Sequence, residues 1–209
     1  MAVDSRTLCI AFALDVSQSM KDSFGFLGRK IDVAKRLLLE LSFFLLKTVG
    51  CYRLHLYLFP SQVPELVPHE RLHQGLVTDK YSVDRLETLL SQLTETRPRT
   101  PLIEALEKIA MEVESRCVIV VITDGEIAHP AISGRTSELS RVLEEKSIES
   151  LILVLNTRPP DFLEALASTV RRIHLEVLRP SLLHSGIIGD TAKHLSSRLA
   201  SLTSGRTRS

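Results

Sequence analysis

The residues best suited to chemistry lie in one short stretch, Asp15-Val16-Ser17-Gln18-Ser19. An uninterrupted apolar run, residues 8–14, leads into it and is typical of a strand that is buried on both faces. In a curving loop, one carboxylate and two hydroxyls at alternate positions can converge on one point. Such oxygen donors are the ligands that Mg²⁺ and Mn²⁺ prefer. The pattern alone is weak evidence, because Ser and Asp are also common in turns and caps.

A second acidic residue, Asp124, follows another apolar run, residues 117–123. Strand patterns alternate with helix patterns along the whole chain, which predicts an α/β fold with a doubly wound, mostly parallel sheet. The carboxyl ends of such strands lie along one edge, where ligands bind. If the two acid-terminated strands are neighbours, Asp15 and Asp124 face each other and repel, and a divalent cation relieves the repulsion.

The remaining elements are expected at the following ranges. Helices are predicted at 29–48, 82–93, 101–114, 137–146, 161–170 and 187–202, with Ser82 and Thr100 as N-caps. Further strands are predicted at 51–59, 75–78, 151–155 and 173–177.

Together these motifs resemble a von Willebrand factor type A (vWA) domain that carries a metal-ion-dependent adhesion site (MIDAS). The family pattern is DxSxS after the first strand, a Thr that opens a helix, and an Asp after the fourth strand, usually as TDG. The matching residues are Asp15, Ser17, Ser19, Thr100 and Asp124. The likeness extends over nearly the whole chain and implies a Rossmann-like sheet of about six strands flanked by helices.

The resemblance also implies a role for each residue. Ser17 and Ser19 bind Mg²⁺ directly, and Thr100 joins them in the ligand-ready state. Asp15 and Asp124 act mainly through bound waters. Neutral hydroxyl ligands leave the ion largely uncompensated, so it can accept a carboxylate from an Asp or Glu of a partner protein. We therefore expect a metal-dependent protein–protein interaction module rather than an enzyme, with Mg²⁺ or Mn²⁺ as cofactor.

The family likewise suggests the kind of partner. Its intracellular members often serve in multiprotein assemblies, several with AAA+ ATPases, and the resemblance implies such an assembly here. Two positions depart from the family pattern: Gln18 and Arg99 stand where Gly is common. Gln18 adds bulk at the loop rim, and Arg99 can steer an acidic partner, although a solvated cation is the simpler interpretation. Glu126 can lie near the site, although a surface acid is favoured.

A competing motif, His69-Glu70-Arg71-Leu72-His73, has the HExxH spacing of zinc hydrolases. That chemistry needs both histidines on one face of a helix, with the Glu beside a zinc-bound water. Pro68 and Gly75 flank the motif closely, so the sequence favours a polar surface loop. A zinc-dependent hydrolase stays one alternative function. A scaffold that binds its partner through helical faces, without metal, is the other.

Composition indicates the number of domains and which classes of partner are not expected. The 209 residues are 44% hydrophobic, which suits one domain with a full core, assigned to residues 1–203 and followed by a polar, disordered tail at 204–209. A net charge of +1 gives no indication of nucleic acid or an anionic membrane surface as partner. No apolar segment approaches the roughly 20 residues of a membrane span, and the first apolar run lacks a cleavage site.

The three cysteines, Cys9, Cys51 and Cys117, are far apart in the sequence and form no CxxC motif. Each lies in or next to an apolar run. We interpret them as small core side chains in a reducing compartment, which favours a cytoplasmic protein.

Overall fold

The computed structural model describes residues 7–60, 69–93, 101–126, 132–180 and 187–204. Its strands form one six-stranded sheet in the order β3-β2-β1-β4-β5-β6. The strands are β1 (Leu8–Asp15), β2 (Tyr52–Phe59), β3 (Glu70–Val77), β4 (Val118–Thr123), β5 (Glu149–Leu155) and β6 (Ile173–Leu178). All neighbours are parallel except β2 and β3. The predicted doubly wound, mostly parallel sheet is therefore confirmed.

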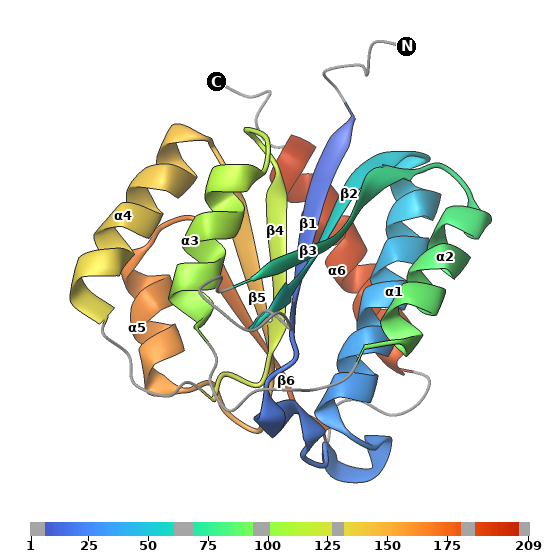
Figure 1. The fold of residues 1–209 in the computed structure, drawn as a ribbon, viewed down its shortest axis with the longest axis horizontal. Coiled ribbons are helices and arrows are strands. Elements are labelled where there is room, and N and C mark those ends of the chain that lie inside the picture. The colour runs from blue at the N-terminus through green and yellow to red at the C-terminus, as the bar shows by residue number, and fades with distance from the viewer. Residues whose placement is uncertain (1–6, 61–68, 94–100, 127–131, 181–186, 205–209) are drawn as a thin grey trace.

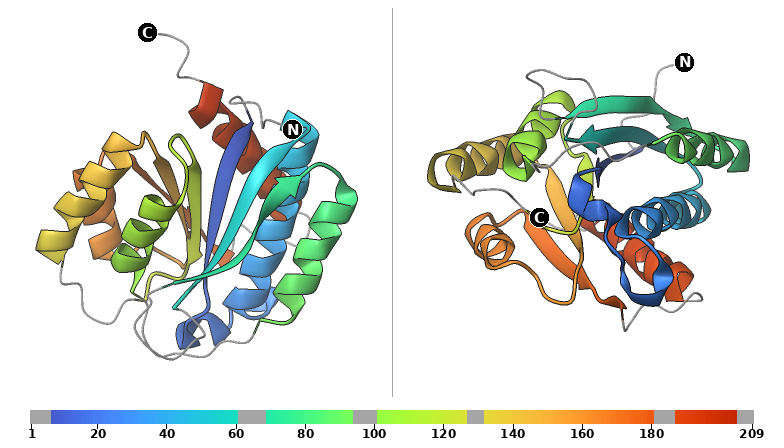
Figure 2. Two further views of the ribbon diagram at one scale, coloured as in Figure 1. Left: turned by 45° about the horizontal axis from the view of Figure 1, so that its top comes forward. Right: turned by 60° about the horizontal axis from the view of Figure 1, so that its bottom comes forward.

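Helices cover both faces of the sheet, as Figures 1 and 2 show. One layer holds α1 (Lys30–Val49), α2 (Lys80–Ser91) and α6 (Ile187–Ser204), and the other holds α3 (Leu102–Glu112), α4 (Ile132–Glu145) and α5 (Asp161–Thr169). Two 3₁₀ helices, η1 (Gln18–Lys21) and η2 (Gly25–Leu27), follow β1. No described helix has the length and apolar character of a membrane span.

The central strands β1 and β4 are apolar on both faces, as their sequences predict. Phe12 and Leu14 belong to the core beneath α1 and α6. Ala11 and Ala13 belong to the core beneath α3, α4 and α5. Polar side chains on these two strands are therefore concentrated at the strand ends, which is where both polar clusters described below lie.

Two helix ends show how local sequence sets the boundaries. α1 stops at Gly50, whose φ of +73° suits glycine and whose N–H donates to the carbonyl of Leu46 over 2.8 Å. α2 begins earlier than predicted, because the cap is Asp79: its Oδ1 accepts the N–H of Ser82 at 2.8 Å. The assignment of Ser82 as the N-cap was wrong.

The HExxH segment belongs to a strand. Glu70 to Val77 pairs antiparallel with β2, so the predicted polar loop is wrong and the strand expected at 75–78 begins earlier. His69 lies just before β3, and its Nε2 contacts Glu112 Oε1 at 2.7 Å. The helix that zinc hydrolase chemistry requires is not formed, since β2 presents an edge that this segment completes.

Two of the cysteines are joined by a disulfide. Cys9 and Cys117 come just before the paired residues Ile10 and Val118, and their Cα atoms are 4.6 Å apart. The interpretation of all three cysteines as unpaired core residues was therefore wrong, and Cys51 alone is free. The sequence hides this pair, because only the adjacency of β1 and β4 brings together residues 108 positions apart.

Candidate functional site

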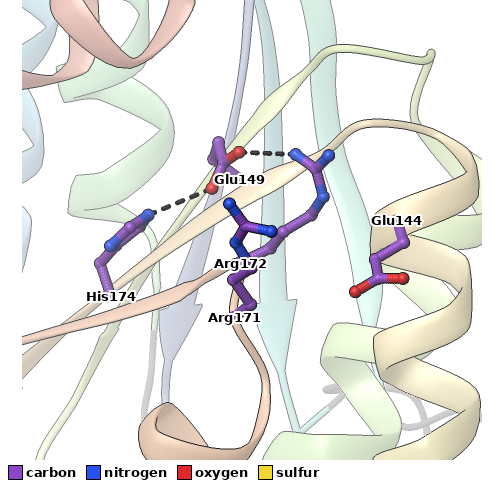
Figure 3. A pocket seen from close by; sticks show the side chains of 5 residues that line it. All are labelled: Glu144, Glu149, Arg171, Arg172 and His174. Carbon is purple, nitrogen blue, oxygen red and sulfur yellow. Dashed lines mark hydrogen bonds and ion pairs between the residues drawn. The ribbon is translucent and has the colours of Figure 1, made fainter.

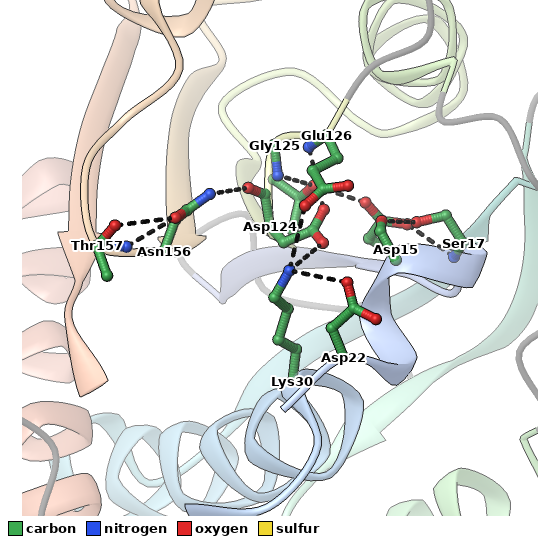
Figure 4. A network of polar contacts seen from close by, with 11 residues as sticks. Asp15, Ser17, Asp22, Lys30, Asp124, Gly125, Glu126, Asn156 and Thr157 are labelled. Atoms are coloured by element: carbon green, nitrogen blue, oxygen red, sulfur yellow. Dashed lines mark hydrogen bonds and ion pairs between the residues drawn. The ribbon is translucent and has the colours of Figure 1, made fainter. Parts of the chain in front are cut away.

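The two acid-terminated strands are neighbours. Leu14 pairs with Ile122, so Asp15 and Asp124 leave the same edge of the sheet, between β1 and β4. The strand order reverses here, because β2 lies on one side of this pair and β5 on the other. Both carboxylates are fully buried. Figure 4 shows them together with the side chains that contact them. We refer to this group as the carboxyl-edge cluster.

Asp15 is held by hydrogen bonds but has no described ion pair. Its Oδ1 accepts the N–H of Ser17 at 2.9 Å, and its Oδ2 accepts the hydroxyl of Thr123 at 2.6 Å. Burial raises the pKa of Asp15 to about 7; the hydrogen bonds oppose this rise, and the charge of Asp124 adds to it. An ionised Asp15 therefore lacks a compensating positive charge among the described residues.

The two serine hydroxyls of the motif lie beside Asp15. Ser17 Oγ and Ser19 Oγ are 3.1 Å apart. The loop that carries them is fixed by Val16, whose N–H donates to Phe59 O at 2.8 Å, and by the fully buried Met20, whose N–H donates to Ser17 O at 3.1 Å. The backbone thus holds both hydroxyls at the end of β1 without help from a ligand.

The turn after β4 is built around Gly125, whose φ is +76°. A Cβ at this position would lie 2.7 Å from Pro160 Cγ, so the turn requires glycine. The Gly125 N–H donates to Thr123 Oγ1 at 3.0 Å, and Asn156 Nδ2 donates to Asp124 O at 3.2 Å. The turn therefore fixes the backbone of Asp124 and also the hydroxyl that binds Asp15.

Lys30 is the residue that the sequence analysis missed. Its Nζ donates to Asp124 Oδ2 at 2.8 Å and lies 3.5 Å from Glu126 and 3.9 Å from Asp22 (Figure 4). Burial lowers the pKa of Lys30, but its contacts with these acids more than offset that, so the net pKa lies above its ordinary value. Lys30 thus places a positive charge directly on one of the two carboxylates.

A signal for Lys30 exists in the sequence. The residue opens α1, and the positive end of the helix dipole disfavours a cation there. An acidic partner would offset this unfavourable interaction, and the acidic end of β4 was an available candidate.

The structure places some of the remaining predicted residues. Gln18 is exposed in η1, next to the two serines. Glu126 has an exposed side chain, as predicted for a surface acid, and it also lies near the site: its N–H donates to Asp124 Oδ1 at 3.1 Å and its carboxylate is 3.5 Å from Lys30 Nζ. Thr100 and Arg99 lie outside the described residues. Pro101 occupies the N-cap position of α3 without a side-chain hydrogen bond, so the helix begins one residue later than predicted and Thr100 is not its N-cap.

The donors present fit a hard divalent cation. Two adjacent hydroxyls and a buried carboxylate without a counter-charge are the ligand types that Mg²⁺ accepts. At Asp124, however, Lys30 makes the site less suited to a cation. Because its ammonium group already contacts Asp124, a metal ion that also used Asp124 would share that carboxylate with Lys30.

A separate cavity of about 620 Å³ lies at the opposite edge of the sheet (Figure 3). Glu149, at the start of β5, accepts hydrogen bonds from Arg172 at 2.6 Å and His174 at 3.1 Å. Arg172 and His174 therefore both contact Glu149, and none of the residues that line this cavity belongs to the carboxyl-edge cluster.

The sheet order and the acid–hydroxyl cluster define the class of fold, that of a vWA domain. No protein-family model matches the chain, and no curated protein matches it. Solved structures do. An aerotolerance-related membrane protein from Bacteroides fragilis has 16% identity and a TM-score of 0.60, with 92% of this chain and 98% of that chain covered.

Two further structures carry the family name. A von Willebrand factor type A protein from Catenulispora acidiphila has 11% identity and a TM-score of 0.64, and covers 92% of this chain. This chain spans 42% of that protein. The SpRpn10 VWA domain has 12% identity and a TM-score of 0.64, with 88% of this chain and 93% of that chain covered. At such identities the likeness shows the fold alone, and the predicted vWA fold is confirmed; metal binding stays a prediction.

Proposed function

We propose that this chain is a protein-interaction module whose carboxyl-edge cluster binds Mg²⁺ or Mn²⁺ and, through the ion, a carboxylate of a partner protein. The observation that carries the proposal is Asp15, a fully buried carboxylate that lacks a described counter-charge and lies beside two paired serine hydroxyls. The vWA fold, shared with the SpRpn10 VWA domain, supports an interaction module in general.

Each residue has a defined part in this proposal. Ser17 and Ser19 would hold the ion, and Asp15 would neutralise part of its charge. The bound ion supplies a Lewis-acidic position that accepts an anionic oxygen. Thr123 keeps Asp15 oriented through its 2.6 Å hydrogen bond. Thr100 completes the ligand set in the proposal, as the family resemblance implies.

The partner is proposed to present an Asp or Glu side chain, within an assembly that can contain an AAA+ ATPase. The proposed compartment is the cytoplasm, where a reducing environment would convert the Cys9–Cys117 disulfide of the structure to two thiols. A metal-independent scaffold is the competing function within the same fold, since the outer faces of the helices are available for contacts.

Calorimetric titration with Mg²⁺ and with Mn²⁺ tests the metal step. We expect one ion to bind the wild-type protein, and binding to be lost in the Ser17→Ala/Ser19→Ala double variant. Ser23→Ala is the matched control, because Ser23 lies in the same loop and donates to Gly25 O instead. Circular dichroism should be unchanged in all three proteins. Absence of binding to the wild-type protein would contradict the proposal.

Affinity capture distinguishes the metal-dependent module from the scaffold. The immobilised protein is exposed to a native extract with Mg²⁺ or with a chelator, and the double variant serves as the control bait. We expect the captured partner to be lost both in chelator and with the double variant. A partner that is retained equally in chelator would favour the scaffold.

A further inference from the structure

A second cluster of metal-binding side chains lies at the other end of β1 and β4. The carboxylate of Glu114 and the sulfurs of Cys9 and Cys117 all lie within 4.8 Å of one another. Glu114 comes from the connection between α3 and β4, at the end of the sheet where β1 and β4 begin (Figure 1). We call this group, with its neighbours Arg53 and His55, the amino-edge cluster.

The backbone presents two of these side chains on one tight turn. Glu114-Ser115-Arg116-Cys117 closes with a hydrogen bond from the Cys117 N–H to Glu114 O at 3.3 Å. Arg116, the third residue of this turn, has a φ of +67°, in the left-handed region. Two ligands separated by two residues is the spacing that structural zinc sites use, and Glu is a zinc ligand type as well as Cys.

Glu114 is oriented by its neighbours. Arg53 Nη1 lies 2.5 Å from Oε1, and His55 Nε2 donates to Oε2 at 2.9 Å. His55 is buried, and its Nδ1 has no hydrogen-bond partner among the described residues. Such histidine–carboxylate pairs orient ligands at metal sites. The pair directs Oε2 of Glu114 toward the sulfur of Cys9, 3.4 Å away.

The contact between Cys9 and Glu114 suits reduced sulfur better than a disulfide. A disulfide sulfur has no proton to donate, so nothing bonds the carboxylate to Cys9 in that form. A thiol can donate to the carboxylate, and a metal ion can lie between a thiolate and the carboxylate. With Zn²⁺, the charges of two thiolates, Glu114 and Arg53 sum to zero, so the site is electrically balanced.

From this geometry we infer that the amino-edge cluster is a redox-dependent zinc site, with Cys9 Sγ, Cys117 Sγ and Glu114 Oε2 as ligands. His55 is a positioning residue that orients Glu114. The side chain of Glu114 is 41% exposed, so water reaches the fourth coordination position. The site is separate from the carboxyl-edge cluster and differs from it in ligand chemistry, because thiolates select zinc over Mg²⁺.

The disulfide and the zinc ion exclude each other. Two small-molecule thiols break the Cys9–Cys117 bond by exchange: two electrons and two protons pass to the protein sulfurs, and the small thiols leave as their own disulfide. Zn²⁺ then replaces the two thiol protons, which pass to solvent. Oxidation by a small-molecule disulfide runs the same steps in reverse and releases the ion.

The test uses the full chain, reduced with a phosphine that is then removed, and metal alone as the probe. Competition with a chromogenic chelator should give one Zn²⁺ per reduced protein and none for the oxidised protein. Co²⁺ should give a thiolate charge-transfer band. Cys51→Ser is the matched control and should keep both signals, whereas Cys117→Ser should lose the band.

Two further variants separate ligands from merely structural residues. Glu114→Gln, at a partly exposed side chain, should keep the circular dichroism spectrum and weaken zinc binding at least about tenfold. His55→Gln should weaken it about 10–100-fold while the Co²⁺ band persists. The Ser17→Ala/Ser19→Ala variant should bind zinc normally at this site. Failure of the reduced protein to bind zinc, resistance of the disulfide to reduction, or full binding by Cys117→Ser would overturn the inference.

Discussion

The two ends of the β1–β4 pair carry polar clusters of opposite character. At the carboxyl edge, Asp15 and Asp124 are fully buried, and Lys30 contacts Asp124 but, among the described contacts, not Asp15. At the amino edge, Glu114 is partly exposed and pairs with Arg53. The β1–β4 pair therefore has hard oxygen donors at one end; at the other end it has two sulfur atoms, with the Glu114 carboxylate from the α3–β4 connection and nitrogen groups from β2 beside them.

The pKa shifts show the same contrast. Burial dominates at Asp15 and raises its pKa to about 7. At Glu114, burial also acts to raise the pKa, but hydrogen bonds from its own backbone and from Arg53 more than offset it, so the net pKa is lowered. The carboxyl-edge cluster has more acidic side chains than the single Lys30 can balance, whereas Glu114 is matched by Arg53 at the amino edge. A site with excess negative charge gains most from an added cation.

The largest expected effect is at Lys30. Lys30→Met leaves Asp124 buried without its partner, and removal of one member of a buried ion pair typically costs about 3 to 5 kcal/mol in the free energy of unfolding. Chemical denaturation in chelator measures this loss. Lys21→Met, at an exposed lysine of η1, is the matched control and should have little effect.

The same variant sharpens the metal proposal. Without the ammonium group at Asp124, Mg²⁺ should bind more tightly and restore more stability in Lys30→Met than it adds to the wild-type protein. If Mg²⁺ restores nothing in Lys30→Met, the ammonium group and the ion do not share a site.

The next effect is a pH dependence at Asp15. Its folded pKa of about 7 lies above the ordinary value of 3.8, so the folded state binds more protons than the unfolded state between these values. The free energy of unfolding should therefore fall as pH rises from 4 to 7, by on the order of 3 kcal/mol. Denaturation curves for the wild-type protein and Asp15→Asn, both in chelator, isolate this contribution by difference.

Saturating Mg²⁺ should reduce the difference in pH dependence between the wild-type protein and Asp15→Asn. The reason is that a cation beside Asp15 favours the ionised form of its carboxyl group. Equal slopes for the wild-type protein and Asp15→Asn in chelator would show that Asp15 does not titrate in this range.

The smallest effect is expected at the amino edge. In the oxidised protein, Glu114→Gln should cost about 1 kcal/mol or less, because the pair with Arg53 is partly exposed and screened by solvent. Urea denaturation measures it, and Glu145→Gln, on the surface of α4, is the control. A cost as large as that at Lys30 would end the distinction between the two clusters.

The central fold was predictable because its signals are local. Apolar runs at β1 and β4, the alternation of strand and helix, and Gly50 after α1 each indicate an element without knowledge of its neighbours. The position of Asp15 and Asp124 at the same edge of the sheet was also predictable, because parallel strands align their carboxyl ends.

The contacts that the sequence did not reveal are long-range ones. Lys30 meets Asp124 across 94 residues, and Cys9 meets Cys117 across 108. Both follow from the adjacency of β1 and β4, which gives no local pattern. Most of β3 was predicted as a loop for a related reason. The strand forms by pairing with the edge of β2, and its own sequence has few buried positions that would indicate a strand.

The cross-link between Cys9 and Cys117 also has a mechanical consequence. It joins the two strands whose far ends carry Asp15 and Asp124, about 20 Å away along β1 at the usual rise per residue. A covalent bond at one end prevents the strands from sliding past each other, so it limits how far the two acidic side chains can separate. Chemistry at the sulfur atoms can thereby alter the shape offered to a ligand on the opposite side of the molecule.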